Sequence, residues 1–311
     1  MTHRKTDIIK GLWLGLLGIV IFAATLPMTR LAVGTPEAPQ MSGLFIAMGR
    51  AVVAAALSAV FLLLTRAPLP RRQDMLALAA IAAGVVLGFP LLTSLAMRHV
   101  EAVHASVIVG VLPLATAGVG ALLHRQRPSV GFWLCAALGS ALVVAFAVLR
   151  SGGAAGGVSI QLADMLLLAA MLCAAVGYGY GAQLAQRLRA EHVICWALVM
   201  ALPLTAPLAL AAWPAEPPRA AAWGAFAYLA VFSMWLGFFA WYRGLALGGT
   251  VRVSQVQLVQ PFLSMLFAVP LLGERLDAVT VGFGLAVIAT VFLGKKMPVN
   301  AAPSSPLPLQ S

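Results

Sequence analysis

Charged side chains are scarce in this chain of 311 residues, and acidic side chains are the scarcest of all. Charged residues make up 9% of the sequence, and only 9 of them are Asp or Glu, whereas a soluble domain carries about a quarter charged residues. Hydrophobic residues make up 62%, and the mean hydropathy is +0.98. This combination excludes an ordinary soluble domain and is typical of an integral membrane protein.

Cysteines and catalytic motifs are also sparse. The three cysteines, Cys135, Cys173 and Cys195, lie inside apolar runs without metal-ligand spacing, and an odd count argues against a disulfide framework. The sequence has no G-x-S-x-G, H-E-x-x-H, C-x-x-C or Walker pattern, so neither an enzyme nor an ATP-driven pump is indicated. We therefore expect no catalytic residue, no cofactor and no metal.

What the sequence has in abundance is long apolar runs. Ten of them approach the 20 or so residues that a membrane-spanning helix needs, and we predict an all-α integral membrane protein. They lie near residues 11–30, 43–65, 75–97, 102–123, 130–149, 165–186, 193–213, 220–242, 251–273 and 278–294. Apart from Arg30, Arg50 and Arg252, these runs carry no Lys, Arg, Asp or Glu. The first run resembles a signal peptide, but nine more follow, and we interpret it as an uncleaved first span.

Basic residues alternate between the connections in a way that predicts orientation. If the N-terminus is cytoplasmic, the inside connections hold 14 Lys and Arg, the outside ones hold 5, and Arg50 is the twentieth. Basic residues concentrate on the cytoplasmic side of membrane proteins. We therefore expect both termini in the cytoplasm, in a plasma membrane that would be the bacterial inner membrane. The same bias explains the net charge of +11 without a nucleic-acid partner.

The two halves of the chain resemble each other. The stretches that begin at Leu87 and Leu236 both open with Leu-Gly-Phe, and both continue to a proline inside a span, Pro113 or Pro261. Each then reaches a charged turn and a Gly-Phe pair. We predict two five-helix repeats, 1–150 and 151–297, and a disordered cytoplasmic tail, 298–311. Because five is odd, the repeats lie in opposite orientations, a common plan of secondary transporters.

Several motifs carry a family resemblance. They are RHVEAVHASVIVGVLPLATA and RQRPSVGFW in the first half, and LGFFAWYRGLALGGTVRVSQVQLVQP and LLGERLDAVTVGFGLAVIATVFLG in the second. They resemble the drug/metabolite transporter (DMT) superfamily, specifically EamA-type exporters, over nearly the whole chain. The resemblance implies a ten-helix inverted-repeat fold with a central cavity. It also implies export of small metabolites such as amino acids, or of drugs. One turn departs from the pattern: Gln126 stands where such proteins often have Glu, as the second half has at Glu274.

Arg50 is the one charge well inside a predicted span. It lies seven residues in from Gly43, or about 10 Å at 1.5 Å per residue, and beside a stripe of small residues that we expect to face other helices. One interpretation is a structural arginine that snorkels outward or binds freed carbonyl groups. The other is an anchor for an anion such as a substrate carboxylate, because no acid inside a span is available as its partner.

Polar and aromatic residues on three spans are further candidates for the cavity wall. Gln257, Gln260 and Ser264 share one helix face at i, i+3 and i+7; hydrogen bonding between helices, worth about 0.6 kcal/mol each, is the alternative. Tyr178 and Trp235 are the aromatic candidates.

The prolines and glycines of the spans predict helix geometry. We predict hinges at Pro113 and Pro261, with plain kinks as the alternative. Glycines four apart predict close helix packing, at Gly11 and Gly15, Gly84 and Gly88, and Gly177 and Gly181.

Proton coupling has few candidates in this sequence. Glu101 and His104 are spaced i, i+3 and could form a proton-responsive pair, although a solvated external turn is an alternative. His99 and His104 are five apart and do not share a face, which argues against a metal site. Since no acid is deep in a span, coupling must use His104, a boundary acid such as Asp164, or an unidentified group. Facilitated diffusion stays open.

The function that these patterns favour is a secondary transporter that exports small metabolites by alternating access. The alternatives are a membrane-embedded partner subunit that transports nothing and a membrane enzyme that acts on lipid. The expected partners are a small-molecule substrate and the lipid bilayer, with no nucleic acid. Whether the chain forms a homodimer is left open.

Overall fold

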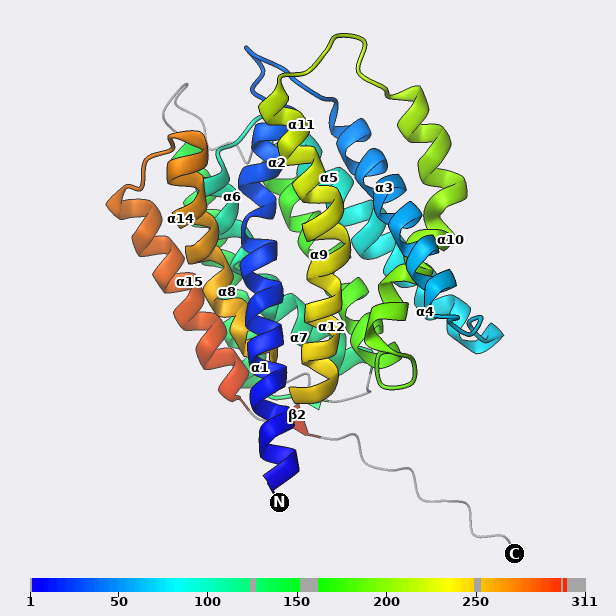
Figure 1. The fold of residues 1–311 in the computed structure, drawn as a ribbon. Coiled ribbons are helices and arrows are strands. Elements are labelled where there is room, and N and C mark those ends of the chain that lie inside the picture. Colours follow the sequence, from blue (N-terminus) through cyan, green and yellow to red (C-terminus); the bar gives the residue numbers. More distant parts are fainter. Residues whose placement is uncertain (1, 124–126, 152–161, 249–252, 298, 301–311) are drawn as a thin grey trace, which may run out of the picture.

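The first five spans of the computed structural model form one repeat of a helical bundle (Figure 1). The structure describes residues 2–123, 127–151, 162–248, 253–297 and 299–300. The elements of this repeat are α1 (Thr2–Ala23), α2 (Thr25–Val33), α3 (Gly43–Leu64), η1 (Arg72–Asp74), α4 (Met75–Ile81), η2 (Ala82–Gly88), α5 (Phe89–Ala96), α6 (Ala102–Val109), α7 (Leu112–Leu123), β1 (Arg127–Pro128) and α8 (Val130–Ser151).

The second repeat follows the same pattern of whole and broken spans. Its elements are α9 (Leu162–Leu184), α10 (Ala190–Ala211), α11 (Ala220–Tyr228), η3 (Leu229–Leu236), α12 (Gly237–Gly248), η4 (Ser254–Val259), α14 (Gln260–Leu272), α15 (Ala278–Lys296) and β2 (Val299–Asn300). Within the described residues, seven helical segments are long and apolar enough to span a membrane, and three shorter apolar helices complete ten. The predicted all-α membrane fold is therefore confirmed.

Helix contacts relate the two repeats by a two-fold exchange. Helix α1, in the first span, packs along α12 in the eighth, and α9, in the sixth, packs along α4 and α5 in the third. Exchanging the halves converts one pair of spans into the other. The pairs α3–α10, α6–α14 and α8–α15 are each converted into themselves. Because each repeat has five spans, this pattern confirms the predicted inverted repeat.

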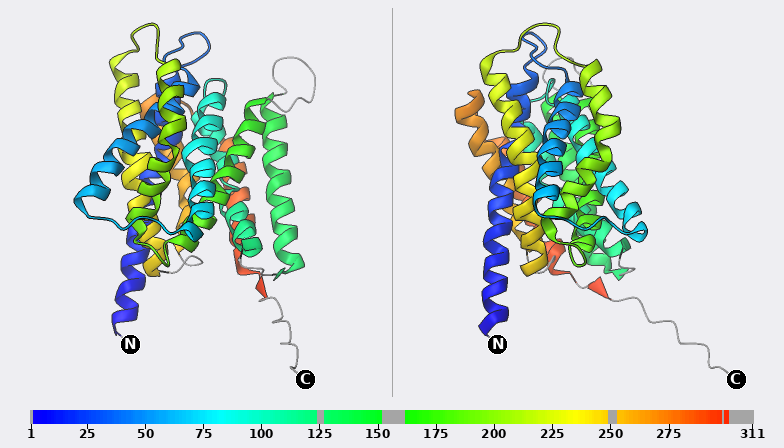
Figure 2. Two further views of the ribbon diagram at one scale, coloured as in Figure 1. Left: turned by 90° about the vertical axis from the view of Figure 1, so that its right-hand side faces the viewer. Right: turned by 45° about the vertical axis from the view of Figure 1, so that its right-hand side comes forward.

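The two ends of the bundle are distinct. Helix α1 begins and α15 ends at one end, which we call the terminal face (Figures 1 and 2). The opposite end, called the distal face, carries the connections 34–42, 97–101, 212–219 and 273–277. Most of the predicted disordered tail lies outside the described residues. Within it, Val299 and Asn300 pair with Pro128 and Arg127 as an antiparallel two-residue strand.

Glycines let the paired helices approach closely. A Cβ atom on Gly244 of α12 would lie 2.7 Å from the backbone nitrogen of Gly15 on α1. At the corresponding contact between the third and sixth spans, a Cβ atom on Gly84 would lie 3.0 Å from the nitrogen of Gly177, and Gly181 leaves space for the Tyr242 hydroxyl. The predicted close packing at the glycine pairs is confirmed, and it occurs at corresponding contacts of the two repeats.

Gly244→Ala tests this packing. The added methyl group meets backbone rather than a movable side chain, so we expect the free energy of unfolding in mixed micelles to fall by about 1–3 kcal/mol. Gly224→Ala, in the same span, is the matched control, because a Cβ atom there meets nothing within 4 Å. Equal stability of the two variants would contradict the packing argument.

Candidate functional site

A small cavity of about 20 Å³ lies at the centre of the bundle. Its walls come from six spans, three in each repeat, so the site exists only where the repeats meet. Secondary transporters with inverted repeats bind their substrates at such an interface. The lining residues are Phe22, Thr25, Arg50, Val85, Phe89, Tyr178, Ser233, Met234, Phe238 and Gln260.

Arg50 brings a positive charge to this cavity. Its side chain projects from α3 and the residue is only 1% exposed, so it does not snorkel outward. Its Nε and Nη1 atoms have no hydrogen-bond partner among the described residues, and thus neither donates to a freed carbonyl group there. An arginine stays protonated in proteins. The structure therefore holds a buried guanidinium, beside a cavity, with donors that no described residue uses.

The ninth span contributes two glutamines with different surroundings. Gln260 lines the cavity. Gln257 is 1% exposed, does not line the cavity, and has no hydrogen-bond partner among the described residues for either amide atom. Nearby, the Thr25 and Ser233 hydroxyl oxygens lie 2.8 Å apart and join the first span to the eighth. The sequence analysis did not single out this hydroxyl pair.

Ser264, the third residue of the predicted polar face, binds the first span. Pro27 has no N–H group, so the Ala23 carbonyl one turn earlier loses its helical donor. The Ser264 hydroxyl donates to that carbonyl oxygen. This contact joins α14 to the break between α1 and α2, and it satisfies the freed acceptor inside the bundle, as a membrane requires. Ser264 therefore serves packing in this structure and does not line the cavity.

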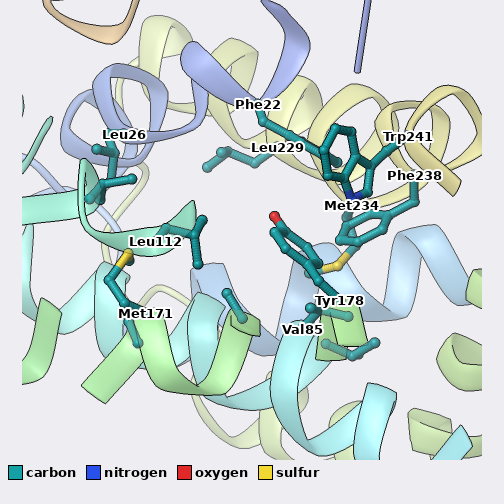
Figure 3. Close-up of a cluster of buried hydrophobic side chains, with 14 of the residues drawn as sticks. Phe22, Leu26, Val85, Leu112, Met171, Tyr178, Leu229, Met234, Phe238 and Trp241 are labelled. Atoms are coloured by element: carbon teal, nitrogen blue, oxygen red, sulfur yellow. The ribbon is translucent and has the colours of Figure 1, made fainter. Parts of the chain in front are cut away.

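Aromatic rings pack together beside the cavity, on the side of the terminal face. Figure 3 shows Tyr178 projecting from α9 toward Phe22, Phe238 and Trp241. The ring centroids of Phe22 and Phe238 are 5.0 Å apart, and those of Tyr178 and Trp241 are 5.9 Å apart. These rings come from the first, sixth and eighth spans, so separating the repeats would have to part them.

Trp235 does not join this aromatic group. Its ring packs against Phe239 at 5.0 Å and against Phe61 at 6.2 Å between centroids, and it is not among the cavity-lining residues. Being deep in a span was the sequence signal for Trp235, and depth alone does not set which way a helix face points.

The backbone is irregular at corresponding places in the two repeats. Segments η2 and η3 are both π-helical, and each leads into a Leu-Gly-Phe motif. They supply Val85, Ser233 and Met234 to the cavity. Segments of π-helix are rare and are frequent at functional sites. The sequence analysis noted the repeated motif but did not predict the wider helical turns before it.

The fourth and ninth spans are also broken at matching points. Helix α7 begins at Leu112 and α14 at Gln260, so Pro113 and Pro261 are each the second residue after a break. A Cβ atom on Gly110, inside the first break, would lie 3.6 Å from the Pro261 ring. The break before Pro113 thus lies next to Pro261.

Comparison with known proteins assigns the family. The sequence profile of the EamA-like transporter family matches residues 9–148 and 161–294, once for each repeat. The chain belongs to the EamA-like transporter family. It is 41% identical, over 290 residues, to the uncharacterized transporter YdeK of Bacillus subtilis (strain 168), covering 91% of this chain and 96% of that protein. A crystal structure 18% identical superposes with a TM-score of 0.62 over 92% of this chain and 98% of that one, which shows the fold alone.

On its distal face the transporter has a wide charged vestibule of about 780 Å³. Its charged lining residues are Arg30, Arg219, Arg275, Glu101, Glu274 and Asp277. The Glu274 carboxylate accepts the N–H groups of Ala102 (2.8 Å) and Val103 (2.7 Å) at the start of α6. Burial raises the pKa of Glu274, and these two hydrogen bonds partly oppose that shift. The position of Gln126, the corresponding turn residue, lies outside the described residues.

His104 has a different partner from the one that its spacing predicted. Its Nε2 atom lies 2.7 Å from Asp164 Oδ1, and the two side chains are 13% and 3% exposed. They lie near the distal ends of α6 and α9, one in each repeat. Glu101 is exposed and lines the vestibule instead. The predicted Glu101–His104 pair is therefore corrected to His104–Asp164, since spacing on one helix cannot reveal an acid from another span.

Metal-ligating side chains do not gather in the described part of the transporter. No group of three or more His, Cys, Asp or Glu is placed to hold a metal ion within those residues.

Ser264→Ala tests the role that the structure gives this serine. The variant leaves the Ala23 carbonyl without its donor, and we expect a loss of about 1 kcal/mol in stability, measured as a lower midpoint of thermal unfolding in detergent. Ser94→Ala is the matched control, because Ser94 is also buried but its hydroxyl has no partner among the described residues. If Ser264→Ala is as stable as that control, the hydrogen bond from Ser264 to the Ala23 carbonyl does not contribute to stability.

Proposed function

We propose that this EamA-like protein is a secondary transporter that exports small metabolites, amino-acid-like or drug-like, across the plasma membrane by alternating access. The observation that carries this proposal is the central cavity, which is lined from both repeats and by Arg50, whose Nε and Nη1 atoms have no partner among the described residues. A cavity built this way changes shape whenever the repeats move relative to each other. A protein that only joined helices together would have no use for a buried charge facing empty space.

The two sides of the cavity differ in a way that fits alternating access. A vestibule of about 780 Å³ lies on the distal face, whereas aromatic rings pack together on the terminal side of the cavity. We propose that substrate leaves through the vestibule after the aromatic group has opened to the terminal face. The π-helical segments η2 and η3, with Pro113 and Pro261, are the proposed hinges, because corresponding elements of inverted repeats can exchange conformations.

The proposed direction of transport follows from the orientation of the protein in the membrane. We propose that the terminal face is cytoplasmic because the sequence assigns 14 basic residues to the connections on the side of the N-terminus and 5 to those on the other side. Movement from the terminal to the distal face is then export.

His104 and Asp164 are the proposed proton-coupling pair, since protonation of either changes a buried contact between the repeats. The repeats are proposed to extend over 1–150 and 151–297.

Transport by purified protein in proteoliposomes tests this function. We expect at least one member of a panel of amino acids, organic acids and cationic dyes to move faster than through protein-free vesicles, with saturation. A panel in which nothing moves, combined with no ligand binding by the purified protein, would overturn the proposal.

Gln257→Met separates transport from packing. Methionine fills a similar volume without polar atoms, so we expect the variant to be at least as stable as the parent and to transport several-fold more slowly. Gln73→Met, at an exposed position in the connection after the second span, is the control. If Gln257→Met transports at the parent rate, Gln257 has no place in the transport cycle.

A reporter fused after Ser311 tests the orientation. We expect a fluorescent protein there to fluoresce and alkaline phosphatase there to be inactive, as for a cytoplasmic C-terminus. The reverse result would make the vestibule face the cytoplasm and the proposed direction uptake.

A further inference from the structure

We infer that the substrate is an organic anion with a carboxylate at one end and a ring or similar apolar body at the other. This inference rests on the proposed transport function and narrows its substrate class. It places the carboxylate on Arg50 in the central cavity. It predicts that compounds carrying only a positive charge are not substrates, and that an added ammonium group weakens binding.

The Arg50 guanidinium is the evidence that one end of the substrate is an anion. Arg50 is buried, faces the cavity, and leaves Nε and Nη1 without a partner among the described residues. Guanidinium donors lie in one plane and match the two oxygens of a carboxylate. Gln260 and Tyr178 line the same cavity and bring an amide and a hydroxyl group to it.

The positions of the acidic residues argue against a cationic substrate. Among the described lining residues of the cavity there is no Asp or Glu. The buried acids found elsewhere already have partners near the two faces, where Asp74 pairs with Arg187, Glu191 with Arg243 and Asp164 with His104. An ammonium group brought next to Arg50 would therefore meet a like charge and no counter-ion, which is unfavourable in a site of low dielectric.

The remaining walls define the apolar body. Phe22, Phe89 and Phe238 surround the cavity together with Val85 and Met234. Rings and methyl groups of this kind favour an aromatic or branched apolar group over a sugar or a polyol. The cavity of about 20 Å³ has room for little more than a water molecule, so the substrate enters only when the repeats separate and the aromatic group opens.

Four ligands that share one ring test this inference. They are phenylpropionate, with the carboxylate alone; phenylalanine, with carboxylate and ammonium; phenethylamine, with ammonium alone; and phenylpropionamide, which is neutral. Binding to the purified full-length protein and transport into proteoliposomes are measured for each. We expect phenylpropionate to bind at least about 10-fold tighter than phenylalanine, and neither phenethylamine nor the amide to be transported.

Variants of Arg50 test whether its charge is responsible for the binding of phenylpropionate. Arg50→Gln is expected to weaken phenylpropionate binding by about 100-fold, as for loss of a charge-assisted pair, and Arg50→Lys to keep part of it. Arg72→Gln removes an exposed charge outside the site and should leave binding unchanged. If Arg50→Gln does not fold, the four-ligand comparison on the parent protein still decides the question.

The outcomes separate this inference from the proposed function. If phenylalanine or phenethylamine is transported as well as phenylpropionate, the anion inference is overturned while the transporter proposal stands. If phenylpropionate is transported equally by the parent and a folded Arg50→Gln variant, Arg50 is not the anchor and the inference also fails. If no ligand in this series or in the wider panel binds or moves, both proposals fail together.

Discussion

The absence of water inside a membrane is the constraint on which the rest of this structure depends. Each polar group there needs a partner within the protein, and an unmet charge is costly. Most of the described groups meet this rule; the carbonyl of Ala23, freed by Pro27, receives the Ser264 hydroxyl. Arg50 and Gln257 are exceptions among the described residues, and Arg50 is the one of the two that carries a charge on its buried, unpartnered atoms. The explanation that we propose for this positive charge is a ligand whose anionic group pairs with it.

The inverted repeat explains why so many irregular features meet at one point. Glycines bring α1 onto α12, and the contact related to it by exchange of the repeats brings α9 onto the third span. These close contacts place η2 and η3 around one cavity. The break before Pro113 lies next to Pro261 for the same reason. Regular helices thus form most of the bundle, and the departures from regular helix lie where the repeats meet.

The sequence predicted the helical fold better than it predicted the residues of the candidate site. Long apolar runs and the repeated Leu-Gly-Phe, Pro and Gly-Phe landmarks were enough for the ten spans and the two repeats, because hydrophobicity and period are local properties. Arg50 was found because a lone charge in an apolar run is conspicuous. Trp235 lies outside the cavity lining, and His104 contacts Asp164 instead of Glu101, since helix rotation and partners from other spans are tertiary properties. The π-helical segments have no established signature in composition or spacing.

The measurement that tests the central claim most directly is an experimental structure of this transporter with phenylpropionate bound. The account predicts carboxylate oxygens about 2.7–2.9 Å from the Arg50 nitrogens, with the ring beside Phe22 and Phe238 in a widened cavity. A ligand bound only in the distal vestibule would contradict it. So would an Arg50 guanidinium satisfied by backbone carbonyl groups, because the charge would then need no substrate.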